Sequence, residues 1–155
     1  IPGNIPWDQA DIAIQHSRAQ WAKLGVTRIN GSALPADNLP ASLLLPMGRN
    51  GPAFLAYPNF QVYLQWNQSL VYATTAAYLA TRLAGASKVS RGSAGALSRN
   101  QMIELQKARV ARGYDVGKVD GILGANTRAA VKAVQAQLGL PADSYPTPEL
   151  LQKLR

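Results

Sequence analysis

A stretch of small and polar residues divides this chain into two parts, and that division limits what each part can fold into. Residues 85–98 read GASKVSRGSAGALS, with two positive charges and no long apolar side chain before Leu97. This composition is typical of a linker. We therefore expect an N-terminal portion at residues 1–85, a linker at 86–97 and a C-terminal domain at 98–155. Each part must build its core from a short length of chain.

The composition favours packed helices and excludes several kinds of active site. The hydrophobic content of 47% leans on alanine, which favours a mainly α fold. Cysteine is absent, which excludes disulfides and thiolate chemistry. His16 is the single histidine, so a zinc site or a Ser-His-Asp triad is disfavoured. We expect no metal, no cofactor and, for want of a long apolar run, no transmembrane segment.

The C-terminal part carries clear signals for three short helices. Ser98 and Gln101 form a capping box for a helix over 99–112, with Gly113 as its stop. The glycine-rich loop at 114–127 has neither phosphate-loop nor EF-hand spacing. A second helix is expected to bury one apolar face, and a third begins with a Thr-Pro cap. Their expected inward residues are Val131, Val134, Leu138, Leu150, Leu151 and Leu154.

The N-terminal part is less regular. Ser17 and Gln20 form a capping box for a short helix, and turn dipeptides flank two short apolar runs at 43–45 and 53–56 that could be strands. The strongest helix is SLVYATTAAYLATRLAG, whose apolar stripe runs from Leu70 through alanines to Leu83. Since the preceding residues offer few long apolar side chains, we expect this portion to pack against chain that is absent here.

Aromatic and amide side chains concentrate in YPNFQVYLQWNQSLVYA, residues 57–73. Aromatic rings can stack on a sugar, and amides both donate and accept hydrogen bonds. An ordinary glycosidase needs paired carboxylates. Residues 1–97 contain no glutamate, and Glu104 and Glu149 lie in first turns of predicted helices. We interpret the cluster as a binding wall with Phe60 and Val62 directed inward, and with the chemistry supplied elsewhere.

The net charge of +8 is spread along the chain without a long basic run. A diffuse positive charge suits an anionic polymer. Nucleic acid is one candidate, and a cell-wall polymer bearing carboxylates is another. Nucleic-acid binding would rest on charge and aromatic residues alone, and it predicts binding that weakens steeply with salt.

Several stretches resemble the lytic murein transglycosylase B family. SRAQWAKLGVTRINGSALP, DNLPASLLLPMGRNGPAFLAYPNF and WNQSLVYATTAAYLATRLAG are similar to the C-terminal part of its catalytic domain. Residues 97–155 look like the peptidoglycan-binding domain often appended to it. The resemblance implies the distal lobe of a lysozyme-like, mainly helical catalytic domain, followed by a small three-helix domain.

The resemblance also implies a reaction and its site. The family cleaves the MurNAc–GlcNAc bond without water, leaving a 1,6-anhydro end, with one glutamate as acid and then base. That glutamate lies upstream of the matched region, so no catalytic residue is expected in this chain. The family's aromatic-Asn-x-Ser-x-x-Tyr-Ala motif places Trp66, Asn67 and Tyr72 along the glycan groove, with Ser69 as a helix cap. Trp66 stands where tyrosine is common.

The implied binding face of the C-terminal domain is less defined. Tyr114, Asp120 and Arg128 lie in or just after the glycine-rich loop and are candidate peptidoglycan contacts. Val134 replaces the usual phenylalanine of a Phe-Gln pair, and Ser144-Tyr145 departs from the usual Asp-Gly. Both departures are interpreted as structural.

These observations predict a segment of a periplasmic lytic transglycosylase. The chain begins at Ile1 with neither an initiator Met nor a signal peptide, so we expect a processed or excised piece of a longer protein. Its expected partners are glycan strands and the N-terminal part of its own catalytic domain. The parent is expected to be the enzyme, and a lipid anchor on it is left open. The alternative is a non-enzymatic wall-binding or scaffold protein.

Overall fold

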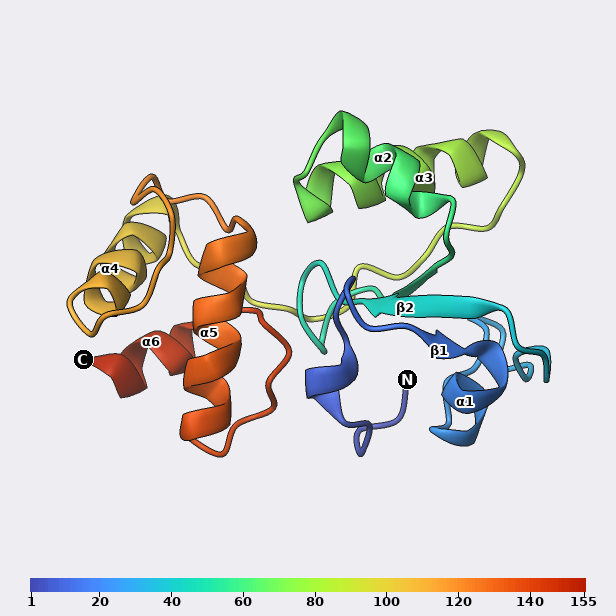
Figure 1. The fold of residues 1–155 in the computed structure, drawn as a ribbon, viewed down its shortest axis with the longest axis horizontal. Helices are drawn as coiled ribbons and strands as arrows, with labels where there is room; N and C mark the ends of the chain where they lie inside the picture. The colour runs from blue at the N-terminus through green and yellow to red at the C-terminus, as the bar shows by residue number, and fades with distance from the viewer. The chain divides into compact units, whose positions relative to one another are not determined.

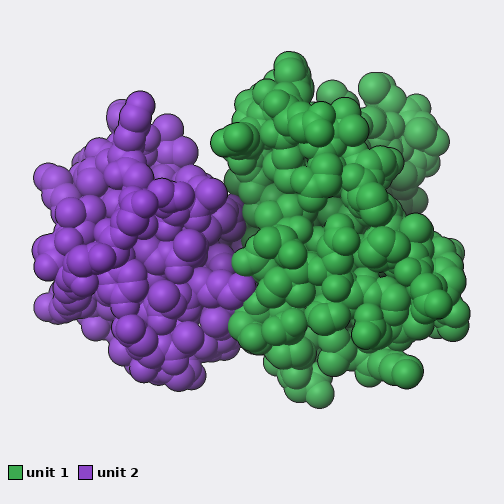
Figure 2. All heavy atoms as spheres, in the orientation of Figure 1, with its two compact units in different colours: residues 1–46, 52–90 green, residues 47–51, 91–155 purple.

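A computed structural model describes residues 1–155 and contains six α-helices and three short strands. The chain forms two compact units, coloured separately in Figure 2. Unit 1 comprises residues 1–46 and 52–90, and unit 2 comprises 47–51 and 91–155. The predicted mainly α class is confirmed. None of the helices has the length and apolar character needed to cross a membrane.

Unit 1 is built around a small antiparallel sheet. The strands β1 (His16–Ser17), β2 (Pro40–Leu44) and β3 (Phe54–Ala56) pair in that order, with Leu43 opposite Leu55. The apolar runs at 43–45 and 53–56 were possible strands; β3 lies within the second run, whereas β2 begins earlier, at Pro40, and overlaps the first run only at 43–44. The two-residue β1 carries too short a pattern to stand out in the sequence.

A capped helix precedes the sheet's central strand in the chain. The predicted capping box forms, since Ser17 accepts from the Gln20 backbone and returns its own N–H to the Gln20 side chain. It starts α1 (Arg18–Lys23), which follows the single turn η1 (Trp7–Gln9). Trp21 on α1 is fully buried, and its indole N–H donates to the Ala41 carbonyl at 2.8 Å. The helix is thereby fixed to β2.

The central strand is buried on both faces. Leu43 belongs to a core with Trp21, whereas Leu44 belongs to a second core with Phe60 and Ala73. Successive side chains of a strand point to opposite faces, so this alternation follows from the strand geometry. The second core carries the helices α2 (Phe60–Trp66) and α3 (Leu70–Leu83), which lie together in Figure 1.

A partly buried ion pair gives unit 1 a predicted acid sensitivity. The Arg18 guanidinium donates to Asp37 through two nitrogens, and this bond holds the pKa of the Asp37 carboxyl below its usual value. Because this pKa is lower in the folded than in the unfolded protein, the ion pair stabilises the fold at pH values above the unfolded-state pKa. The stabilisation is lost as the pH falls through the folded-state pKa. We expect Asp37→Asn to lower the melting temperature near neutral pH and to match the wild type in strong acid. An equal deficit at both pH values would contradict this account.

Unit 2 contains α4 (Arg99–Val110), α5 (Ala125–Gln137) and α6 (Pro148–Leu154). The predicted caps form: Ser98 and Gln101 make a capping box, and Thr147 caps α6 with Pro148 in its first turn. The helices share one core, with Leu97 and Tyr114 packed on its edge. Its buried members are Met102, Leu105, Val131, Val134, Leu150, Leu151 and Leu154.

Two helix ends differ from the prediction. Helix α4 ends at Val110 rather than 112, while Gly113 does adopt the positive φ of 81° expected of a helix stop. Leu138 was expected inside, but it is 44% exposed. The reason is that α5 ends at Gln137, so Leu138 serves as its C-cap and leaves the buried face.

Two buried glutamines hold the loops of unit 2. Gln106 on α4 donates to the carbonyls of Lys118 and Ile122 and accepts from the Gly121 N–H at 2.9 Å. Gln135 on α5 likewise forms hydrogen bonds to the loop before α6, which are described below. Each glutamine supplies hydrogen-bond partners to loop backbone that belongs to no helix or strand.

Candidate functional site

The junction between α2 and α3 forms the candidate site. The Asn67 N–H donates to the Tyr63 carbonyl at 2.9 Å and closes α2. Two residues later the Ser69 hydroxyl accepts from the Tyr72 N–H at 3.3 Å, which makes Ser69 the N-cap of α3 as predicted. The two caps bring the end of one helix and the start of the next into a tight corner.

Two aromatic rings meet at this corner and both face solvent. Trp66 is 73% exposed and Tyr72 is 46% exposed. Their ring centroids are 5.5 Å apart with an interplanar angle of 63°, an edge-to-face contact. Aromatic pairs favour this geometry, so the contact holds each ring in place and leaves apolar ring surface free. An exposed aromatic pair suits stacking against the apolar face of a sugar.

Asn67 lies between the two rings in sequence and is half-buried. Its side-chain oxygen accepts from the Ser69 N–H at 2.9 Å, and its amide nitrogen makes no hydrogen bond. Both N–H donors of the amide group are therefore available to a ligand. The corner offers ring faces for stacking and directed donors for a carbonyl or hydroxyl.

The prediction for the rest of α2 is half right. Phe60 is buried at 7% exposure, as expected, but Val62 was expected inside and is 64% exposed. Successive helical residues are about 100° apart. Val62 therefore points almost opposite to Phe60, whereas Tyr63 shares the Phe60 side and packs on the same core.

Helix α3 buries only part of its predicted apolar stripe. Ala73 is buried, but Leu83 at the other end of the stripe is 81% exposed. Leu79, which is not part of the predicted stripe, is also 57% exposed. Leu79 and Leu83 are four residues apart and lie on the same side of α3, so this side of the helix is apolar and exposed.

No carboxylate belongs to the aromatic corner. The acids of unit 1 are Asp8, Asp11 and Asp37. Asp37 is committed to Arg18, while Asp8 accepts from Gln9 and Asp11 accepts from the backbone of Ala13. The corner therefore offers groups for stacking and hydrogen bonding, and it holds no carboxylate that could act as a general acid or base.

The three candidate residues of the C-terminal domain do not form one cluster. The Tyr114 hydroxyl donates to Gln137 at 2.9 Å, and its ring packs on the core. Asp120 accepts from the Ile122 N–H at 2.8 Å within the glycine-rich loop. Arg128 is only 8% exposed; burial lowers the pKa of its guanidinium, and the nearby Tyr145 and Asp143 partly offset this.

Comparisons with protein-family models give a match for each of the two parts of the chain. Residues 1–81 match the transglycosylase SLT domain family, and residues 98–154 match the putative peptidoglycan-binding domain family. A comparison with curated proteins finds no match.

Solved structures give a similarity over the whole chain. Two crystal structures of SltB3 from Pseudomonas aeruginosa are 43% identical, with TM-scores of 0.80 and 0.79. One is a complex with NAG-anhNAM-pentapeptide and the other with NAG-NAM-pentapeptide. The match covers 100% of this chain and 43% of the SltB3 chain, so this chain spans less than half of its relative's length.

Proposed function

This chain belongs to the transglycosylase SLT-domain family, and from that premise we propose that it is the distal, substrate-lining part of a peptidoglycan lytic transglycosylase. The observation that carries the proposal is the exposed Trp66–Tyr72 pair, which offers a platform for a glycan with no carboxylate beside it. We propose the division 1–85, 86–97 and 98–155 for the groove-lining portion, the linker and the peptidoglycan-binding domain. The parent acts in the periplasm.

The proposed reaction cleaves the MurNAc–GlcNAc bond without water. A glutamate on preceding chain protonates the glycosidic oxygen and then accepts the proton of the sugar's own 6-hydroxyl, which closes the 1,6-anhydro ring. An internal nucleophile needs positioning more than activation. Stacking on Trp66 and Tyr72, with hydrogen bonds from Asn67, supplies that positioning. The exposed apolar residues of α3, including Leu79 and Leu83, receive the preceding part of the catalytic domain.

The proposed division of labour predicts binding without cleavage. When the 155-residue chain is incubated with isolated sacculi, we expect it to sediment with them and to release no anhydromuropeptides. The measurement pairs a sedimentation assay with chromatography of the soluble fraction. Soluble anhydromuropeptides would mean that a catalytic group lies within these residues. Failure to sediment would remove wall binding itself and leave the proposal without support.

A further inference from the structure

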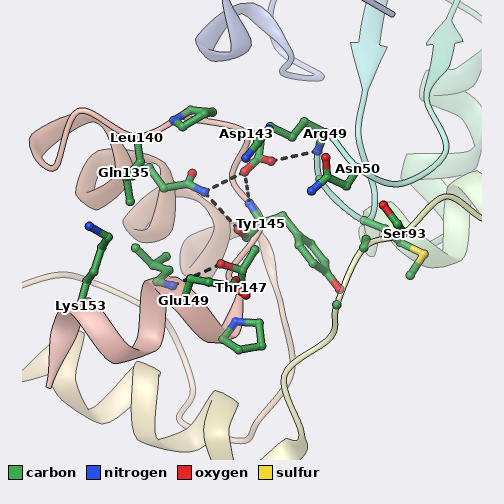
Figure 3. Close-up of a pocket in the computed structure, with 17 residues that line it drawn as sticks. Arg49, Asn50, Ser93, Gln135, Leu140, Asp143, Tyr145, Thr147, Glu149 and Lys153 are labelled. Atoms are coloured by element: carbon green, nitrogen blue, oxygen red, sulfur yellow. Dashed lines mark hydrogen bonds between the residues drawn. The ribbon is translucent and has the colours of Figure 1, made fainter. Parts of the chain in front are cut away.

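Unit 2 contains a pocket of about 340 Å³ that none of the candidate residues lines. Its walls come from three stretches of unit 2 that are distant in sequence: residues 47–50, 93–95 and 135–153. Figure 3 shows Lys153 on one side of this pocket and Arg49 and Asn50 on the other. The volume falls within the range of small-ligand sites.

A buried carboxylate fixes the walls of the pocket. Asp143 is 5% exposed and accepts from the Arg49 N–H at 2.9 Å through one oxygen. Its other oxygen accepts from the Gln135 side chain at 2.7 Å and from the Tyr145 N–H at 3.1 Å. Gln135 also accepts from the Ser144 N–H at 3.0 Å. The pocket is therefore preformed, and ligand binding need not order its walls.

The backbone adopts special conformations at the same place. Gly48 has a φ of 70°, and a Cβ there would lie 2.7 Å from the Cβ of Tyr145. Ser144 has a φ of 62°, the one positive value in a residue other than glycine. For Ser144 this conformation is uncommon, and the hydrogen bond from its N–H to Gln135 holds it there. Only glycine at position 48 allows the loop at 47–51 to lie this close to Tyr145.

The pocket lining carries two cations, Arg49 and Lys153, and two acids, Asp143 and Glu149, so any preference for an anion depends on which of them already have partners. Asp143 is already surrounded by donors, and the cation of Arg128 lies close enough to interact with it. Arg49 and Lys153 line the pocket, and neither forms a salt bridge. Glu149 is the one other acid in the lining, and hydrogen bonds from its own backbone and from the Thr147 side chain lower the pKa of its carboxyl, so its charge has donors near the start of α6. Lys153 is thus a cation that a ligand can reach.

The remaining polar groups suit a peptide better than a sugar ring. Asn50 and Ser93 line the pocket with an amide and a hydroxyl, which can pair with peptide N–H and C=O groups. The aromatic residue of the lining, Tyr145, is only 9% exposed and presents little ring face for stacking. In unit 1, by contrast, Trp66 and Tyr72 expose such faces.

We propose that this pocket binds the peptide stem of peptidoglycan, with Lys153 pairing the free carboxylate at the end of the peptide. The inference rests on the proposed function and deepens it: unit 1 holds the glycan and unit 2 holds the peptide. The pairing is a charge-assisted hydrogen bond between an accessible ammonium and a carboxylate. Gly48 and Asp143 position the walls and do not contact the ligand's charge.

The test uses the 155-residue chain and two synthetic peptides. One is an N-acetylated pentapeptide ending in a free D-Ala-D-Ala carboxylate, and the other is the same peptide with its C-terminus amidated. We expect the first to bind and to shift the NMR signals of Ser93 and Lys153, and the amidated peptide to bind about tenfold more weakly. Lys153→Gln should weaken binding of the peptide with the free carboxylate by a similar factor. Lys107→Gln, which changes an exposed lysine on α4, is the control and should leave that binding unchanged.

A second variant tests the shape of the pocket. Gly48→Ala places a methyl group against Tyr145, so peptide binding should fall even with Lys153 in place. Circular dichroism and the NMR spectrum of α4 would show whether unit 2 stays folded in each variant. Equal affinity for both peptides, equal binding by Lys153→Gln, or no binding of either peptide would each overturn the inference. Sedimentation with sacculi that persists in such a case would leave the proposed function standing.

Discussion

Gln106→Leu is expected to unfold unit 2 at temperatures where the wild type remains folded. Gln106 is fully buried, and its side-chain amide joins α4 to the glycine-rich loop. Leucine fills a similar volume but can neither donate nor accept. The carbonyls of Lys118 and Ile122 and the N–H of Gly121 would then lose their partner inside the protein.

The size of the effect follows from the number of groups left unpaired. A hydrogen bond of this kind contributes about 0.5–1.5 kcal/mol, and these three bonds are only partly buried, so losing them costs roughly 2–4 kcal/mol in total. A domain of about 60 residues has little more than this to lose. The apolar side chains of the core would be unchanged, so the lost stability would come from the missing hydrogen bonds to the loop.

The measurement is thermal unfolding of the whole chain, with NMR signals assigned to each unit. Signals of α4 and α5 should disperse poorly in Gln106→Leu while the Trp21 indole signal of unit 1 stays in place. Gln152→Leu, on the exposed side of α6, is the matched control and should leave both units folded. If unit 2 of Gln106→Leu unfolds at the same temperature as in the wild type, the loop backbone finds other hydrogen-bond partners.

The role of the two glutamines was not predicted from the sequence, although a signal was present. Leu105-Gln106 and Val134-Gln135 are apolar–glutamine pairs on successive helices, and each is followed by a turn, Asp120-Gly121 or Asp143-Ser144. The same order of pair and turn occurs twice, and in both cases the glutamine hydrogen-bonds the backbone of the turn that follows it. Composition and helical periodicity do not distinguish a buried glutamine from an exposed one, so no role was predicted for Gln106 or Gln135.

Local signals predicted most of the fold. Capping boxes, turn dipeptides and the Thr-Pro start of α6 act within a few residues, and a sequence displays them directly. The contacts that build the pocket of unit 2 are different in kind. The Arg49 N–H and the Asp143 carboxylate are separated by 94 positions, and the sequence around neither residue predicts contact with the other. Long-range pairing of this sort lies beyond a reading based on local pattern.

The same distinction applies to the site residues. Trp66, Asn67 and Tyr72 lie within one helix–corner–helix stretch, so a motif of seven positions could place them together. Tyr114 and Arg128 were grouped by nearness to the glycine-rich loop in sequence. Helix α5 directs Arg128 toward Asp143 and Tyr145 instead, because residues near the start of a helix can face a different wall from the loop before it.

Trp66→Ala is expected to weaken glycan binding without changing stability. The side chain is 73% exposed, so its removal costs little core packing, but it takes away the larger ring of the aromatic pair. Loss of a stacking platform should reduce affinity for a chitin-derived tetrasaccharide by roughly tenfold. Tyr72 would also lose its edge-to-face neighbour, so its remaining ring surface would be less fixed. In the complete parent enzyme the same change should lower turnover.

The control and the readouts separate binding from folding. Val62→Ala removes an exposed apolar side chain from the same helix, away from the aromatic corner, and should leave affinity and melting temperature unchanged. Titration calorimetry with the tetrasaccharide gives the affinity, and thermal unfolding gives the stability. A large fall in melting temperature in Trp66→Ala would return this residue to a packing role. Unchanged affinity with the fold intact would remove the aromatic corner from the glycan groove, because no other exposed ring pair in unit 1 could replace it.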